Sequence, residues 1–481
     1  MFNHNTAPIF NSLLKHKKKV KGNFHVPGHK KATAFDKKGL SWFKKILQID
    51  FTEVGDLDDL YQATGCIKDA LQLAADAFLA EHTFFLVGGT TAGILAAIFA
   101  TTKKDNNLLI QRTSHQAVFN GCLLKGIHPY ILTPKFNSKT YLELPLDVNY
   151  LEDVLKKNQK ISAVLITSPS YYGVVQPLKD IAYCCHKQKI PLIVDEAHGA
   201  HFSFSKDLPP SAMEANADIS IQSTHKTLTS MTMSSMLHLK SNYIKKEDIA
   251  YWLSIFQSSS PSYPLLASLD LTRRYMMTKG QKQLPKTLNF LKEFRKQITK
   301  LKFLKEVKSK YPTDPFKMLL TTKPFHLSGF TLAKLLQQWG CFVELADLDK
   351  VLFYFSLGTK LRELKYLSKI LQKIDSLIPK LKKEQKIAPL SFESKELTSN
   401  SFKMFDVKNG EFVTLPLQKA LGKITAKMLI PYPPGIPLIL PGQLFTKNII
   451  TYIETFLFKG GIIKGLIDTK PATVLVIKEE V

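Results

Sequence analysis

Four short segments of the chain contain residue types that could act on a bound group. Gly88-Gly89-Thr90-Thr91 joins an expected strand to an expected helix, and small residues with hydroxyls at a helix N-terminus can hold a phosphate. Asp195 ends an expected buried strand, Ser223-Thr-His-Lys226 follows the next strand, and His115 begins a helix. Each segment alone has an ordinary structural explanation, such as a capping turn, a solvated lysine or a core histidine.

Taken together, the four segments supply what pyridoxal phosphate requires. Lys226 follows Asp195 by 31 residues and would form the Schiff base with the cofactor. Asp195 would keep the pyridine nitrogen protonated, so that the ring can withdraw electrons from a substrate. The glycine–threonine turn would bind the phosphate, and the imidazole of His115 would stack on the ring face.

The part of the chain that carries these residues alternates short apolar strands with helices. We expect strands at 83–87, 108–111, 129–132, 163–167, 192–195, 218–222 and 236–239, and helices at 68–80, 90–101, 114–125, 150–158 and 177–187. This alternation predicts an α/β fold with a mostly parallel large-domain sheet covered on both faces. Ligands of such sheets bind at the carboxyl ends of the strands, where Asp195 falls.

Length and composition suggest several domains. At roughly 150 residues per domain, 481 residues predict about three. We expect an irregular N-terminal segment at 1–60, a cofactor-binding large domain at 61–312, a small α/β domain at 313–385 and a C-terminal α+β domain at 386–481. The small domain would contain strands at 317–320 and 351–355 and helices at 330–339 and 361–376. The lysine-rich stretch 380–386 is expected to be a linker.

At these residues the chain resembles the Orn/Lys/Arg decarboxylase family, a branch of the fold-type I (aspartate-aminotransferase-like) pyridoxal-phosphate enzymes. The matching stretches lie in the family's order from about 24 to 443. They are Phe24-His-Val-Pro-Gly-His-Lys30, Leu57-Asp-Asp-Leu60, Gly89-Thr-Thr91, Ser168-Pro-Ser-Tyr-Tyr-Gly173, Asp195-Glu-Ala-His-Gly-Ala-His-Phe202, Ser223-Thr-His-Lys-Thr227, Ser260-Pro-Ser-Tyr-Pro264, Ala267-Ser-Leu-Asp270 and Tyr432-Pro-Pro-Gly-Ile-Pro437. The length is similar to that of the short bacterial branch, which lacks an N-terminal wing domain.

The resemblance implies a role for each matching position. Lys226 would be the Schiff-base lysine, Asp195 the partner of the pyridine nitrogen and His115 the residue stacked on the ring. The remaining cofactor and substrate contacts would come from Thr90, Thr91, Ser223 and His225 at the phosphate, from Ala197 against the ring, and from His198 near the phenolic oxygen or the substrate. No metal is expected.

The resemblance also implies an activity and an assembly. Family members remove the α-carboxylate of arginine, lysine or ornithine and release the corresponding amine, a polyamine precursor. They are homodimers or larger homo-oligomers, with the active site at the subunit boundary. Two alternatives remain open: a non-catalytic paralogue that binds the cofactor, and a pyridoxal-phosphate enzyme of another reaction type, such as an aminotransferase or an aldolase.

The sequence departs from the family at positions that concern the substrate. Gln443 stands after Pro-Gly where relatives tend to have an acid, and in larger relatives that acid helps to bind the distal cation of the substrate. Glu53 is a candidate to replace it, as are Asp56, Asp58 and Asp59. In addition, His115-Gln116-Ala117 stands where the family commonly has His-Lys-Ser.

Composition argues against several other classes of protein. The 66 basic and 40 acidic residues give a net charge of +26, yet almost all basic residues are lysine, whereas nucleic-acid readers favour arginine. We therefore expect no nucleic-acid partner. Since no apolar run reaches the roughly 18 residues of a membrane helix, no membrane association is expected. The 5 cysteines form no CxxC pair, which argues against a zinc site or a disulfide framework and favours a cytoplasmic location.

Overall fold

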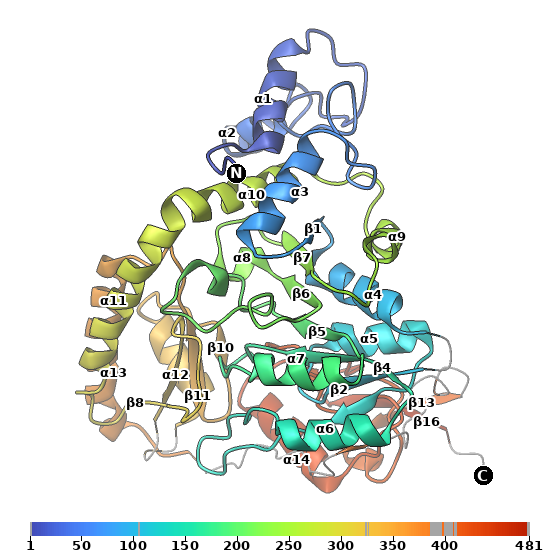
Figure 1. The fold of residues 1–481 in the computed structure, drawn as a ribbon. Coiled ribbons are helices and arrows are strands. Elements are labelled where there is room, and N and C mark those ends of the chain that lie inside the picture. Colours follow the sequence, from blue (N-terminus) through green and yellow to red (C-terminus); the bar gives the residue numbers. More distant parts are fainter. Residues whose placement is uncertain are drawn as a thin grey trace. The chain divides into compact units, whose positions relative to one another are not determined.

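A computed structural model describes residues 2–103, 106–322, 325, 327–384, 397–398, 407 and 411–478. The chain forms two compact units, each assembled from two stretches of sequence. Figure 1 shows their helices and strands, coloured along the sequence. The first unit contains Met1–Thr101 and Leu178–Pro285, and the second contains Thr102–Pro177 and Lys286–Val481. Part of the expected linker at 380–386 lies outside the described residues.

The strands of the first unit follow the order β1-β7-β6-β5. They are β1 (His82–Leu86), β5 (Leu192–Asp195), β6 (Ile219–Gln222) and β7 (Ser235–Leu239). The neighbouring strands β5 and β6 are parallel, with Asp195 opposite Ile221. The pairs β6–β7 and β1–β7 are antiparallel. Every residue of β5, β6 and β7 is buried, as expected for strands with helices on both sides.

Helix α4 (Gly89–Thr101) begins where β1 ends and packs on β1, β6 and β7. Its sequence is apolar almost all round, which is the pattern of a helix buried on several sides. Gly93 allows the close approach, because a Cβ at this position would lie 2.7 Å from Cδ1 of Leu86 and 2.9 Å from Cγ2 of Ile221. The sheet therefore fixes the N-terminus of α4 beside the ends of the strands.

The expectation that residues 1–60 are irregular is wrong, since they contain α1 (Pro8–Lys19) and α2 (Lys37–Leu47). Pro8 starts α1 with a pre-set φ, and Ile9 and Leu13 point one turn apart into the core. The lysines of the second half of α1 obscure this stripe in the sequence. Asp36 caps α2 by accepting a hydrogen bond from the Gly39 amide at 3.0 Å.

The other helices of the first unit are α3 (Cys66–Ala77), α7 (Leu178–Lys187), α8 (Thr224–Thr227), α9 (Lys246–Phe256) and α10 (Tyr263–Tyr275). Helices α1, α3 and α10 contact one another, and α9 packs on α4. Inside α10, Arg273 and Asp270 form a buried ion pair at 2.6 Å, and Asp270 also accepts from the Ile9 amide at 3.0 Å. The N-terminal segment is therefore an integral part of this unit.

The second unit contains a parallel set of strands in the order β4-β2-β3, where β2 is Asn107–Gln111, β3 is Tyr130–Leu132 and β4 is Ile161–Thr167. Helices α5 (Gln116–Lys125) and α6 (Val148–Lys157) follow β2 and β3 in the chain. The short strand β12 (Leu397–Thr398) pairs antiparallel with β3. The expected alternation of strand and helix is confirmed in both units.

Two further groups of elements complete the second unit. An antiparallel sheet in the order β10-β11-β9-β8 consists of β8 (Lys305–Glu306), β9 (Lys317–Thr321), β10 (Leu345–Ala346) and β11 (Lys350–Tyr354), and is followed by α13 (Leu361–Leu377). Helix α12 (Gly329–Gln337) belongs to the same region, and α11 (Gln281–Ile298) begins in the first unit and continues into the second after Pro285.

The C-terminal part of the second unit has its own apolar core. It contains the pairs β13 (Phe412–Pro416) with β16 (Thr473–Ile477) and β14 (Ile430–Pro431) with β15 (Ile463–Lys464), together with α14 (Lys447–Phe458). Their apolar side chains form one cluster, with Ile439, Ile453 and Val474 fully buried. Among the described residues, no helix is both long enough and apolar enough to cross a membrane.

Candidate active site

Lys226 lies in α8, a single turn that follows β6. Its side chain is exposed, and its Nζ lies 3.2 Å from Nε2 of His198, which is buried. A neutral imidazole at this distance can accept a proton from the ammonium group. Lysine is a nucleophile only as the free amine, so this pair suits a lysine that reacts with a carbonyl carbon.

Asp195 is the last residue of β5 and is 3 % exposed. One of its oxygens accepts a hydrogen bond from the Ala197 amide at 3.2 Å. Burial raises the pKa of Asp195, while the charge of Lys226 and the Ala197 amide partly oppose that shift. A buried carboxylate of this kind is stabilised by a further cation, and a protonated ring nitrogen would be one.

The next residue, Glu196, is fully buried and serves the scaffold instead. Its carboxyl accepts hydrogen bonds from the Ala212 amide at 2.9 Å, the Ser220 hydroxyl at 2.7 Å and the Gln222 amide group at 2.8 Å. Burial raises the pKa of Glu196 to about 7 despite these donors. Glu196 thereby ties β5 to β6, the two strands that present Asp195 and the Lys226 turn.

Hydroxyl groups cluster at the N-terminus of α4. Thr90 Oγ1 is hydrogen-bonded to Ser223 Oγ and lies 3.1 Å from Ser235 Oγ. Gly89 starts the helix with a φ of +72°, a conformation that favours glycine. The exposed Thr91 follows Thr90 on the same turn. The free backbone N–H groups of a helix N-terminus and these hydroxyls form a suitable cradle for a phosphate.

Two side chains hold this cradle in shape. His225 donates from Nδ1 to the Ser234 carbonyl at 2.8 Å. Burial lowers the pKa of His225, the Ser234 hydrogen bond opposes that shift and the nearby charge of Lys226 adds to it. Gln257 accepts from the Val87 and Gly88 amides at 2.8 and 3.2 Å, which closes the turn before α4. Gln257 was not predicted from the sequence, because it comes from a distant loop.

His115 belongs to the second unit, where it precedes α5 and accepts a hydrogen bond from the Ala117 amide at 3.2 Å. The C-terminal turn 431–438 packs against its ring. A Cβ on Gly435 would lie 3.0 Å from both Cδ2 and Nε2 of His115, and the Gln116 amide donates to the Gly435 carbonyl at 3.0 Å. Arg112 is buried and donates to the Pro437 and Leu438 carbonyls at 2.7 and 2.9 Å. This turn therefore fixes the orientation of the imidazole.

The residues suggested as partners of the substrate's distal cation differ in how many hydrogen bonds and ion pairs they already form. Gln443 accepts from the Leu440 amide at 2.8 Å and closes a local turn. Asp58 accepts from the amides of Asp59, Thr64, Gly65, Ile67 and Lys68, and Asp56 pairs with His16 at 2.7 Å. Glu53 has one buried oxygen without a hydrogen-bond partner among the described residues.

Comparison with known proteins identifies the family. The family model described as Orn/Lys/Arg decarboxylase, major domain, matches residues 7–313. The chain belongs to this family. A second model, Orn/Lys/Arg decarboxylase, C-terminal domain, matches residues 391–459. The domain boundaries expected near 60, 312 and 385 stay a prediction.

Relatives with curated names support the same family. The uncharacterized protein YaaO of Bacillus subtilis is 34% identical over 481 residues, which cover 98% of this chain and 99% of YaaO. The arginine decarboxylase of Bacillus subtilis is 31% identical over 491 residues, which cover 100% of this chain and 99% of the relative. The chain is thus similar to Orn/Lys/Arg decarboxylases over its whole length.

Solved structures show the fold. Lysine decarboxylase A from Pseudomonas aeruginosa superposes with a TM-score of 0.84 at 20% identity, covering 98% of this chain and 80% of that one. The constitutive lysine decarboxylase of E. coli gives a TM-score of 0.82 at 20% identity, covering 98% and 82%. The predicted fold-type I architecture is confirmed.

Proposed function

We propose that this protein is a pyridoxal-phosphate-dependent decarboxylase of a basic amino acid (arginine, lysine or ornithine), and that its product is a polyamine precursor. The observation that carries the proposal is the arrangement at the ends of β5 and β6. Buried Asp195, exposed Lys226 and the adjacent His198 lie in the same unit as the hydroxyl cradle at α4. Family membership supports decarboxylation as the reaction.

The residues present fit the cofactor. Asp195 is a buried carboxylate with a raised pKa, which suits a protonated ring nitrogen as its partner. Thr90, Ser223 and the N-terminus of α4 would hold the phosphate, and Ala197 would lie against the ring. Lys226 would bind the aldehyde carbon. We also assign His115 to the ring face and His225 to the phosphate.

Each protein group then has a defined task in the reaction. Bound pyridoxal phosphate supplies the electron sink for the pair that remains when the α-carboxylate leaves as carbon dioxide. Asp195 holds the proton on the ring nitrogen, because its buried negative charge favours the charged ring. His198 can accept a proton from Lys226 Nζ, and Lys226 can return a proton to the α-carbon and so complete the amine.

The proposal includes a homodimer or a larger homo-oligomer in the cytoplasm. Large apolar side chains of the N-terminal segment are exposed, including Phe24 at 97%, Trp42 at 83% and Phe43 at 53%. Clusters of exposed aromatic residues are typical of protein interfaces. A second copy of the chain would cover them.

The test is direct. Purified protein is loaded with pyridoxal phosphate, its visible absorption is recorded, and carbon dioxide and amine are measured with L-arginine, L-lysine and L-ornithine. The wild type and Lys240→Ala, which removes an exposed lysine just after β7, should show the band and the activity, and Lys226→Ala should lose both. A wild-type protein that stays colourless after loading would sink the cofactor assignment. A coloured protein that releases no carbon dioxide from any basic amino acid would leave only the non-catalytic paralogue or another reaction type.

A further inference from the structure

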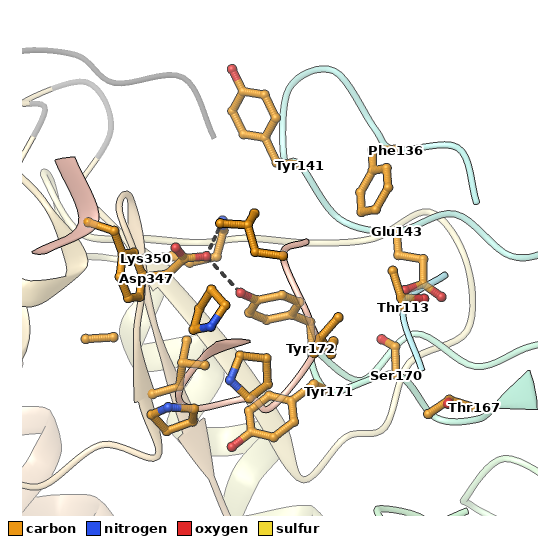
Figure 2. A pocket seen from close by; sticks show the side chains of 18 of the residues that line it. Thr113, Phe136, Tyr141, Glu143, Thr167, Ser170, Tyr171, Tyr172, Asp347 and Lys350 are labelled. Carbon is orange, nitrogen blue, oxygen red and sulfur yellow. Dashed lines mark hydrogen bonds and ion pairs between the residues drawn. The ribbon is translucent and has the colours of Figure 1, made fainter. Parts of the chain in front are cut away.

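A cavity of about 150 Å³ lies in the second unit, at the carboxyl ends of β2 and β4 (Figure 2). Thr113 follows the end of β2 by two residues, and Thr167 is the last residue of β4. A cavity of similar volume accepts benzene, so this one has room for about six heavy atoms, as in a guanidinium on a short alkyl chain. Its walls are mainly aromatic, proline and aliphatic side chains, beside six polar or charged residues, and such a mixture is the usual character of a small-molecule site.

Glu143 is the acid on one side of the cavity, next to Thr113 (Figure 2). It is 7% exposed, and its Oε1 accepts from the side-chain amides of Gln111 at 2.5 Å and Gln176 at 3.3 Å. Both donors are neutral. Within the described part of the chain, no lysine, arginine or histidine forms an ion pair with Glu143. Burial raises the pKa of Glu143 to about 7, with Thr113 and Gln111 lowering it only in part.

The opposite wall carries charges that are already paired. Asp347 accepts from the Tyr172 hydroxyl at 2.8 Å and lies 3.9 Å from Lys350 Nζ, as the dashed lines in Figure 2 show. Lys350 also pairs with Asp349. This wall therefore holds its own cation, and Glu143 is the carboxylate in the cavity that an incoming cation would neutralise.

The cavity borders the turn that positions His115. Residues 431–438 supply Pro431, Pro433, Pro434, Ile436 and Leu438 to its wall. Gly435 of the same turn packs on the His115 ring, and Thr113 lies two residues before that histidine. The cavity is therefore adjacent, within one unit, to the residue assigned to the face of the cofactor.

We propose that this cavity receives the distal ammonium or guanidinium group of the substrate and that Glu143 is the carboxylate that pairs with it. The inference rests on the proposed function and names the specificity-determining residue of that same site. The inference explains how this protein could bind a basic substrate although Gln443 carries no charge. The negative charge would come from Glu143, in the loop before α6. The rings of Tyr171, Tyr172 and Phe136 would contact the alkyl chain and the cation.

The test compares Glu143→Gln with the charge-matched control Glu152→Gln, which removes an acid from α6 outside the cavity. Both holoenzymes are assayed with L-lysine, L-arginine and L-ornithine. L-norleucine, which lacks the distal ammonium of lysine, serves as a competing ligand. Glu143→Gln should raise KM for at least one basic amino acid tenfold or more, with kcat changed less than threefold, and should leave the affinity for L-norleucine unchanged. Glu152→Gln should behave as the wild type.

A second measurement does not depend on turnover. Binding of agmatine and 1,5-diaminopentane to each holoenzyme is followed by calorimetry, and Glu143→Gln should weaken the tighter of the two at least tenfold. Glu143→Asp, which keeps the charge on a shorter side chain, should recover part of this loss. The glutamine variant should fold, because it removes a buried charge and keeps the shape. Its melting temperature and cofactor spectrum establish this.

The outcomes separate the two proposals. If the wild type decarboxylates a basic amino acid and Glu143→Gln has the same KM, the subsite is refuted and the proposed function stands. If the wild type shows no turnover but binds an amine through Glu143, the subsite stands and decarboxylation does not. A wild-type holoenzyme that binds none of these amines, or binds them equally well as Glu143→Gln, overturns the assignment of the cavity.

Discussion

Gly435 gives a sharp test of how the C-terminal turn controls the site. Its φ is +91°, and a Cβ would approach Cδ2 and Nε2 of His115 to 3.0 Å. Gly435→Ala should therefore cost about 1–2 kcal/mol for the left-handed conformation and roughly 1–3 kcal/mol more for the forced displacement of the ring. Gly422 is the matched control, because its φ is +76° and nothing lies within 4 Å of a Cβ there. Gly422→Ala should show only the first cost.

The assay has two parts. Denaturant unfolding should give a free energy of unfolding that falls by about 1–2 kcal/mol in Gly422→Ala and by roughly 2–5 kcal/mol in Gly435→Ala. Titration with pyridoxal phosphate should show an affinity loss of about threefold or more for Gly435→Ala alone. A threefold loss corresponds to about 0.7 kcal/mol, which is less than the cost of displacing the ring. Equal losses of stability in the two variants, with unchanged cofactor affinity in both, would refute the argument that this turn holds His115 in place.

Three further predictions concern charge. Asp195→Asn should keep the fold and much of the cofactor, but its kcat should fall about a hundredfold or more, because the ring nitrogen loses its counter-charge. If this variant released carbon dioxide at the wild-type rate, Asp195 would have no part in the mechanism. The pKa of Glu143 is raised to about 7, so Glu143 must lose a proton before it can pair with a cation. The ratio of KM for L-lysine to the dissociation constant of L-norleucine should therefore fall as the pH rises from 6 to 8, and it should stay level in Glu143→Gln. A level ratio in the wild type would contradict this. Gln443→Glu should change KM for the basic amino acids less than about twofold, because the Leu440 amide holds that side chain. A tenfold drop in KM would instead place the distal cation at Gln443.

Much of the first unit was predictable because its signals are local. A buried strand followed by Asp195, and a second strand followed by Ser223-Thr-His-Lys226, fix both residues at one edge of a parallel pair. Strand and helix bounds agree with the sequence to within a few residues, since apolar runs and glycine turns mark their ends. The helices α1 and α2 were missed because lysines interrupt their apolar stripes.

The remaining features depend on contacts between distant parts of the chain. Gly435 meets His115, although about 320 residues separate them, and neither residue indicates the other in the sequence. Glu143 lies in a loop without a local sequence signal, and only the structure around it shows that its hydrogen-bond donors, Gln111 and Gln176, are neutral. Gln257 likewise closes the turn before α4 from a separate loop.

The hydrogen bonds of Glu196 place a constraint on the length of β5. Successive residues of a strand face opposite sides, so Asp195 can face the reaction while its neighbour binds Ser220 and Gln222 on β6. Loss of one residue within β5 would move Glu196 into the place of Asp195, where its carboxyl would project one methylene farther toward the cofactor. Gain of one residue would instead move Asp195 into the socket of the longer Glu196. The spacing between the start of β5 and Asp195 can therefore tolerate neither insertion nor deletion.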